Sequence, residues 1–243
     1  KIFRNQNYTD SLEHFLYGYS DIYDTWWVFV PGNYISRHSV AQPGSEYLIK
    51  VKASGYPEAT AITNIPEIVE IENVDTFRVI LAPGEFVSLN TGLKCKIRFT
   101  DPLSVTNYYL LTVKKVPTVS KFYNNIEINS KDPIVEELLH SRYNEGIAFS
   151  DKVINGQTYE FSLVIRNEDI AKVQTYEEDY SLHFILYSIT EEYFKFIKAL
   201  NQYSKNFGNP LSDPVMMFSN VNGGFGMFTG AAVSSVSIKY SFK

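Results

Sequence analysis

The stretch SITEEYFKFIKALNQYSKNFGNP, residues 188–210, decides the fold class because only here does the hydrophobic period change from two to about 3.6. Ser188 and Glu191 have the spacing of a capping box. Apolar residues then recur at three- and four-residue steps: Tyr193, Phe196, Ile197, Leu200, Tyr203 and Phe207. We therefore expect an amphipathic helix near 188–207 that lies on a sheet, with Gly208 and Pro210 placed to end it.

Most of the remaining chain alternates apolar and polar residues, the pattern of half-buried strands. The clearest alternation covers 93–99, and Tyr108–Val113 is apolar on both faces, as expected of a central strand. Similar alternation recurs over 47–53, 59–65, 159–165, 180–186 and 236–242. A short helix is also expected around 134–140. The sequence thus predicts a mainly β protein of sandwich type with one inserted helix.

The length of 243 residues allows one large or two ordinary domains. Ala82, Pro83 and Gly84 bring several breaking cues together, so we expect a boundary after them. The predicted domains are a β-sandwich over 1–84 and a second β domain with the helix over 85–243.

Charge and composition exclude several classes of protein. The net charge is -5 and no basic run occurs, which argues against a nucleic-acid partner. No apolar run approaches the roughly eighteen residues that a membrane-spanning helix needs. Cys95 has no partner for an internal disulfide and is expected to be a buried apolar group. The chain begins at Lys1 without an initiator Met, so any targeting segment is expected upstream.

The sequence contains no recognisable set of catalytic residues. None of the four His has the spacing of a zinc hydrolase, and no Gly-x-Ser-x-Gly elbow occurs. Glu137 and His140 are three residues apart on the expected short helix, which is half of a di-metal motif. A hydrolase using this pair is kept as a minor alternative to a solvated helix face. We predict no enzymatic activity, no metal and no cofactor.

The candidate contact residues are exposed aromatics and the glycine run after the helix. Glycine would let the backbone pass close to the preceding helix or to a partner, or these residues would merely close the domain. The tryptophans would stack on a sugar, dock a partner protein or pack at a domain interface. The candidates are Trp26, Trp27, Tyr203, Asn220, Asn222, Gly223, Gly224, Phe225 and Phe228.

Three segments carry a resemblance to a known family. The first is GSEYLIKV at 44–51, the second IRFTDP at 97–102 with FSD at 149–151 and NGQTY at 155–159, and the third runs from YFKF at 193–196 to GMF at 226–228. Together they resemble the outer-membrane lipoproteins of Bacteroidetes that form domain-of-unknown-function family 4249. The likeness covers roughly residues 32 to 242, and residues 1–31 do not match well.

The resemblance implies a signal-peptide lipoprotein of the outer membrane, facing the cell surface or the periplasm and encoded beside TonB-dependent transporters. It implies an Ig-like or transthyretin-like first sandwich and an N-terminal lipid anchor as the link to the membrane. The function expected from it is an accessory subunit of a TonB-dependent nutrient importer that binds the transporter, or other surface lipoproteins, or captures cargo. The alternative is a stand-alone glycan- or peptide-binding module.

Overall fold

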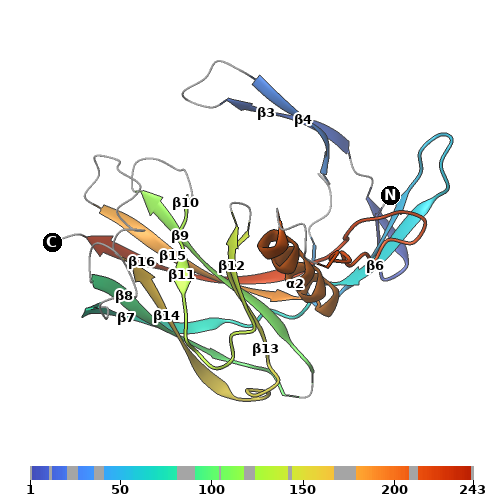
Figure 1. Cartoon of the computed structure of the whole chain (residues 1–243). Helices are drawn as coiled ribbons and strands as arrows, with labels where there is room; N and C mark the ends of the chain where they lie inside the picture. The colour runs from blue at the N-terminus through green and yellow to red at the C-terminus, as the bar shows by residue number, and fades with distance from the viewer. Residues whose placement is uncertain are drawn as a thin grey trace. The chain divides into compact units, whose positions relative to one another are not determined.

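A computed structural model of the chain describes residues 2–10, 13–20, 27–35, 41–80, 91–103, 105–117, 124–141, 144–166, 179–207 and 213–241. Within these ranges the protein is mainly β, with antiparallel strand pairs and one inserted helix (Figure 1). The predicted fold class is confirmed, including the sandwich and the helix between strands.

The chain divides into two compact units. Unit 1 comprises residues 1–65 and 219–229, and unit 2 comprises 66–218 and 230–243. This division lies at residue 65, whereas the predicted boundary lay at residue 84. The difference arises because the strand before residue 84, β7, pairs with β8 of unit 2 from Ile71 to Ile80. The breaking cues at 82–84 therefore lie between two paired strands of one sheet.

Unit 1 contains a four-stranded sheet in the order β2-β1-β5-β6 and a separate two-stranded sheet, β3-β4. Its strands are β1 (Ile2–Arg4), β2 (Asn7–Asp10), β3 (Glu13–Ser20), β4 (Trp27–Ile35), β5 (Glu46–Val51) and β6 (Ala59–Asn64). The alternation at 47–53 and 59–65 correctly predicted the antiparallel pair β5 and β6.

Unit 2 contains a six-stranded sheet and a four-stranded sheet. One has the order β12-β13-β9-β15-β16, with β10 also on β9, and the other has the order β11-β14-β8-β7. The strands of these sheets are β7 (Ile71–Ile80), β8 (Thr91–Thr100), β9 (Tyr108–Pro117), β10 (Asn124–Asn125), β11 (Ile128–Asn129), β12 (Glu137–Ser141), β13 (Asn144–Ser150), β14 (Thr158–Arg166), β15 (Asp179–Ile189) and β16 (Ala231–Ser241).

The core of unit 2 lies between its two sheets. Alternate residues of β8, β14, β9, β13 and β15 point inward and form one buried cluster, because side chains on a strand alternate between faces. Four aromatic rings occupy part of it: Phe99, Tyr109, Phe149 and Phe161. Cys95 lies fully buried in this core, as predicted.

Helix α2 (Glu191–Asn206) covers one end of the outer face of the larger sheet. Its N-cap is Thr190, whose side chain accepts a hydrogen bond from the Tyr193 backbone. The predicted cap, Ser188, was wrong because Ser188 is still paired within β15.

The predicted buried stripe of α2 was partly wrong. The buried residues are Phe194, Ile197 and Asn201, while Tyr203 and Phe207 are exposed. Apolar residues occur on several sides of this helix, so periodicity alone left the contact face undetermined. The polar contacts described below belong to the buried side.

The predicted short helix around 134–140 was also wrong. Residues 137–141 form β12, which pairs with β13 from Glu137 opposite Ala148 to Ser141 opposite Asn144. Leu138 packs against the core between the sheets and Leu139 packs beneath α2, so adjacent residues face opposite sides, as in a strand.

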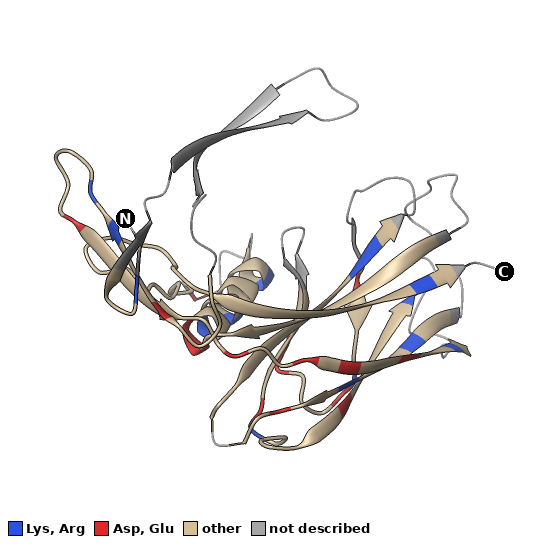
Figure 2. Cartoon of the chain, turned by 180° about the vertical axis from the view of Figure 1, so that it is seen from behind, with Lys and Arg blue, Asp and Glu red and all other residues tan. Residues whose placement is uncertain are grey.

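The charged residues of unit 2 are unevenly distributed along its strands. Lysine and arginine gather toward the strand ends near the chain's C-terminus (Figure 2). Along the individual strands, Lys94 lies near the start of β8, and Lys114 and Lys239 lie near the ends of β9 and β16. The opposite strand ends carry the buried carboxylates considered below.

Candidate contact surface

The predicted contact residues fall into both units. Tyr203 lies on α2 in unit 2, whereas the candidates from Asn220 to Phe228 lie in the part of unit 1 formed by residues 219–229. Trp26 lies outside the described residues, and of Trp27 only the backbone, at the start of β4, is described. We call residues 219–229 the glycine loop.

The glycine loop is attached to the edge of β6. Thr60 and Asn222 exchange two backbone hydrogen bonds, from Thr60 N to Asn222 O at 2.9 Å and from Asn222 N to Thr60 O at 2.8 Å. These bonds satisfy polar groups of a strand edge that would otherwise be available to another chain. The loop therefore continues the sheet of unit 1 beyond β6 (Figure 1).

Asn220 closes the glycine loop on itself. Its side-chain amide donates to Phe228 O at 2.6 Å, and its side-chain oxygen accepts from Phe228 N at 2.8 Å. Ser219 Oγ accepts from Gly226 N at 3.1 Å, and Asn220 N donates to Gly226 O at 3.2 Å. The Asn220 side chain is thus used for structure and offers little to a ligand.

Gly223 is required where the loop meets β6. Its φ is +76°, a conformation that L side chains rarely adopt, and an added Cβ would lie 2.6 Å from the carbonyl oxygen of Glu58. The close approach is therefore to β6 and its preceding residue, both in unit 1. Gly224 is less constrained, since its added Cβ would meet Val221 at 3.4 Å and Ala59 at 3.6 Å.

Phe225 is the most exposed aromatic of the glycine loop, with 76% of its surface accessible. A large apolar side chain held at this exposure on a hydrogen-bonded loop is available to a partner. Asn220, Asn222 and Gly223 make their described contacts within unit 1, in agreement with the interpretation that these residues close the domain. Phe225 is the most exposed aromatic candidate in the glycine loop.

Tyr203 lies in the second candidate region, the exposed end of α2. Its ring centroid lies 6.1 Å from that of Phe207, the C-cap residue, and both side chains are exposed. The pair forms a small aromatic surface at the end of the helix.

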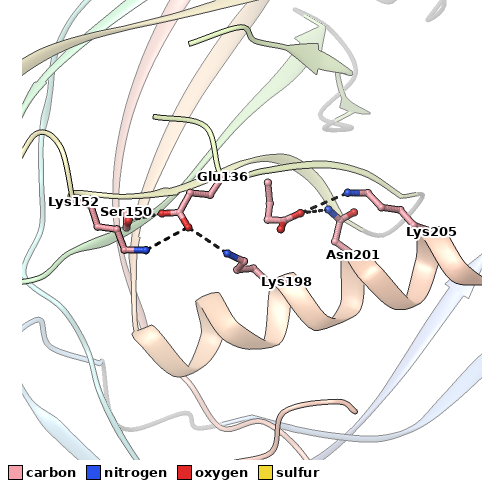
Figure 3. A network of polar contacts seen from close by, with 7 residues as sticks. Glu136, Ser150, Lys152, Lys198, Asn201 and Lys205 are labelled. Carbon is pink, nitrogen blue, oxygen red and sulfur yellow. Dashed lines mark hydrogen bonds and ion pairs between the residues drawn. The ribbon is translucent and has the colours of Figure 1, made fainter. Parts of the chain in front are cut away.

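A row of polar contacts holds α2 against the strands of unit 2 (Figure 3). Glu136 lies 3.3 Å from Lys198 Nζ and 3.8 Å from Lys152 Nζ, and it accepts a hydrogen bond from Ser150 Oγ. Burial alone would raise the pKa of Glu136, but the hydrogen bonds from Ser150 and Lys198 and the nearby lysine charges lower that pKa overall.

The neighbouring Glu137 binds the second half of the helix. Asn201 donates to its carboxylate at 2.5 Å and to Leu138 O at 3.2 Å, while Lys205 Nζ lies 3.7 Å from the same carboxylate. Sequence reasoning missed these contacts because it expected a short helix at 134–140, where the structure has the strand β12 against which α2 packs.

The hydrolase alternative depended on Glu137 and His140 lying three residues apart on a helix, and these residues lie on the strand β12 instead. Glu137 lies on a strand and is engaged by Asn201 and Lys205, and the side chain of His140 lies outside the described residues. No group of three or more His, Cys, Asp or Glu suited to a metal occurs among the residues that the structure describes. Burial raises the pKa of the Cys95 thiol to about 12, which disfavours the reactive thiolate.

Two buried carboxylates join the loops at one end of unit 2. Asp101 accepts hydrogen bonds from Gly156 N at 2.9 Å and from the Tyr109 hydroxyl, and Asp151 accepts from Asn107 N at 2.9 Å. Burial raises the pKa of Asp151, and the bond from Asn107 N opposes that rise. The motifs Asp101-Pro102 and Ser150-Asp151 were visible in the sequence, but their mutual proximity was not.

No helix among the residues that the structure describes is both long enough and apolar enough to cross a bilayer.

Comparisons with known proteins identify a family. A family model described as a domain of unknown function, DUF4249, matches residues 3–237. A search of curated proteins found no significant match. Among solved structures, a protein from Archaeoglobus fulgidus shares 12% identity over 72% of this chain and 98% of its own, with a TM-score of 0.26. Because the family match spans nearly the whole sequence, the chain belongs to the DUF4249 family.

Proposed function

We propose that this protein is a non-enzymatic outer-membrane lipoprotein that serves as an accessory subunit of a TonB-dependent importer, binding the transporter or capturing its cargo. The observation that carries the proposal is the glycine loop, which is fastened to β6 by paired backbone bonds and presents Phe225 at 76% exposure. The loop would form a contact with the transporter or with another surface lipoprotein.

Preorganisation supports this role for the glycine loop. A contact loop that is already ordered loses less conformational entropy on binding than a loose one. The bonds of Asn220 to Phe228 and of Asn222 to Thr60 supply that order within unit 1. An exposed aromatic on such a support has the properties of an interface anchor.

The lipoprotein and transporter parts of the proposal come from the family resemblance. The three resembling segments include the glycine loop and the end of α2, and the family match covers both. No described residues form a metal-ligating group that would favour a catalytic alternative. A contact function is consistent with both observations.

The direct test is isolation of the native outer-membrane complex. A transporter recovered in stoichiometric amount with the full-length protein is the expected result. Its absence from complexes prepared under gentle conditions would count heavily against the subunit role.

Single variants then locate the contact. Phe225→Ser is expected to reduce recovery of the transporter at least about tenfold, since it removes one buried anchor at the interface. Phe207→Ser is the matched control, because Phe207 is 77% exposed on α2 in unit 2. If Phe207→Ser lowers recovery of the transporter and Phe225→Ser does not, the contact lies at the end of α2, beside Tyr203.

Binding by the purified chain distinguishes the stand-alone alternative. Tight binding to a glycan or peptide in the absence of a transporter would favour the glycan- or peptide-binding module. That module would use exposed aromatics such as Trp26 or Trp27, whose side chains lie outside the described residues. Substituting both tryptophans would show whether such binding depends on them.

A further inference from the structure

Three aliphatic side chains are exposed at the loop end of unit 2, where β8 and β13 end and β9 and β14 begin. Leu103 is 73% exposed and Val105 60% exposed on the loop after β8, and Val153 is 66% exposed on the loop after β13. We call these three residues the aliphatic tip. Single exposed aliphatics are ordinary, but three on neighbouring loops require an explanation.

The two loops of the aliphatic tip are fixed against each other. Asp151 N donates to Asn107 O at 3.0 Å, and Asn107 N donates back to the Asp151 carboxylate at 2.9 Å. The Leu103 side chain lies directly over Gly156, where an added Cβ would be 2.6 Å from Leu103 Cδ1. The outward position of the tip therefore belongs to the ordered structure of unit 2.

At the aliphatic tip the negative charges are buried and the positive charge is exposed. The loops 101–107 and 151–157 contain two carboxylates, Asp101 and Asp151, and both are almost completely buried. Their one basic residue, Lys152, has a side chain that is 68% exposed and lies 3.8 Å from Glu136. The outer surface of these loops thus combines aliphatic groups with a cation and presents no exposed carboxylate of its own.

A lipid surface fits these properties better than a protein partner. Energetically important protein contacts are enriched in Trp, Tyr and Arg, whereas Leu and Val are under-represented. A stable protein interface also buries about 800 Å² on each side, which is more than three side chains supply. Aliphatic groups flanked by lysine, by contrast, suit the boundary between headgroups and acyl chains.

We propose that the aliphatic tip inserts into the interfacial layer of a phospholipid bilayer, with Lys152 at the level of the headgroups. Leu103, Val105 and Val153 would exchange water for acyl chains. Asp101 and Asp151 would act from inside unit 2 by holding the two loops in the inserted arrangement. This membrane contact is separate from any lipid anchor.

Flotation of the full 243-residue chain with vesicles tests the insertion. Binding is expected to be stronger to vesicles containing phosphatidylglycerol than to pure phosphatidylcholine, by about fivefold, because of the Lys152 charge. The double variant Val105→Ser and Val153→Ser is expected to lower partitioning at least about tenfold. Val233→Ser, on β16 of the same unit and 49% exposed, is the matched control and should bind like the parent chain.

A site-specific probe supplies a second measurement that does not depend on the serine variants. Val105→Cys can be labelled with a dye whose emission reports local polarity, because the chain's own Cys95 is fully buried. The emission is expected to shift to the blue on addition of anionic vesicles. The same dye on Val233→Cys should show no shift.

Three outcomes would overturn the membrane contact. The first is vesicle binding by the double serine variant at the level of the parent chain, and the second is a dye at Val105→Cys that stays in water while the protein is bound. The third is loss of a protein partner by the double variant with unchanged lipid binding, which would make the tip a protein contact. The tip lies in unit 2 and the glycine loop in unit 1, so the transporter proposal can fail while this one holds.

Discussion

Gly223 is the residue at which a single added methyl group has the clearest expected cost. Replacing it with alanine forces a side chain into φ +76° and places Cβ 2.6 Å from Glu58 O. We expect Gly223→Ala to lower the free energy of unfolding of unit 1 by about 1–3 kcal/mol. Chemical denaturation followed by amide signals of β5 and β6 would measure it.

The adjacent glycine provides the control for this substitution. Gly224→Ala meets its neighbours at 3.4 Å and 3.6 Å, so its effect should be much smaller. Equal losses in the two variants would show that the approach of the loop to Glu58 is not what fixes the position of Gly223.

Glu136 should make the free energy of unfolding depend on pH in the acidic range. Its pKa is lowered in the folded protein, so the charged form contributes stability above the ordinary pKa of 4.5, and that contribution is lost as the pH falls below it. Glu136→Gln should therefore lower the free energy of unfolding by about 1 kcal/mol at neutral pH and by much less near about pH 3.5. Thermal unfolding of the parent protein and of Glu136→Gln at the two pH values measures this difference in stability.

Glu67→Gln is the comparison for the acid effect, because Glu67 is an exposed carboxylate of the same unit outside the Glu136 cluster. It should leave the difference between the two pH values unchanged. A Glu136→Gln chain that loses stability equally at both values would contradict a role for the charge.

At the scale of single elements, the strands followed from the sequence because a period of two is a local property. The alternation over 93–99, 159–165 and 180–186 corresponds to β8, β14 and β15, whose inward residues form the core. The existence of helix α2 also followed from a local property, its period of about 3.6, but its first residue did not. Thr190 caps it because the preceding residues, Ser188 and Ile189, remain paired with β9 and β16.

Elements whose pairing is not visible in the local spacing of apolar residues did not follow from the sequence. β12 was predicted as a helix because its pairing with β13 is not visible in the spacing of Leu138, Leu139 and His140. The candidate site behaves similarly. Phe225 was named as a contact candidate from the sequence, but the binding of Asn222 to Thr60 joins residues far apart in the chain and was not foreseen.

The contact face of α2 can be tested with two residues of the same type. Phe194 is buried against Tyr108, with ring centroids 5.0 Å apart, and belongs to the cluster that joins the helix to the sheet. Phe194→Ala should lower the free energy of unfolding by about 3–5 kcal/mol. Equilibrium denaturation followed by far-ultraviolet circular dichroism measures the change.

Phe196→Ala is the matched substitution, two residues along the same helix. Phe196 is only half-buried and lies beside Tyr193, with ring centroids 6.3 Å apart. Its loss should be clearly smaller than that of Phe194. The reverse order would restore the stripe that periodicity predicted, which included Phe196 and left out Phe194.

At the scale of the whole molecule, the chain passes between its units more than once. Unit 1 is completed by residues 219–229, which follow most of unit 2 in the sequence. Local patterns could not reveal this, since the turn cues at 82–84 imply a single crossing. The two possible boundaries, residue 65 and residue 84, predict different behaviour for fragments.

A fragment of residues 66–243, with 219–229 replaced by a flexible linker, should fold on its own. It retains both sheets of unit 2 and the core between them. A fragment of residues 85–243 lacks β7, which leaves the long edge of β8 unpaired and uncovers part of the core at Val74. We expect the longer fragment to unfold cooperatively, and the shorter one to melt at a markedly lower temperature or to aggregate. Calorimetry of both fragments distinguishes the two boundaries. Equal stability of the two fragments would favour a boundary at residue 84.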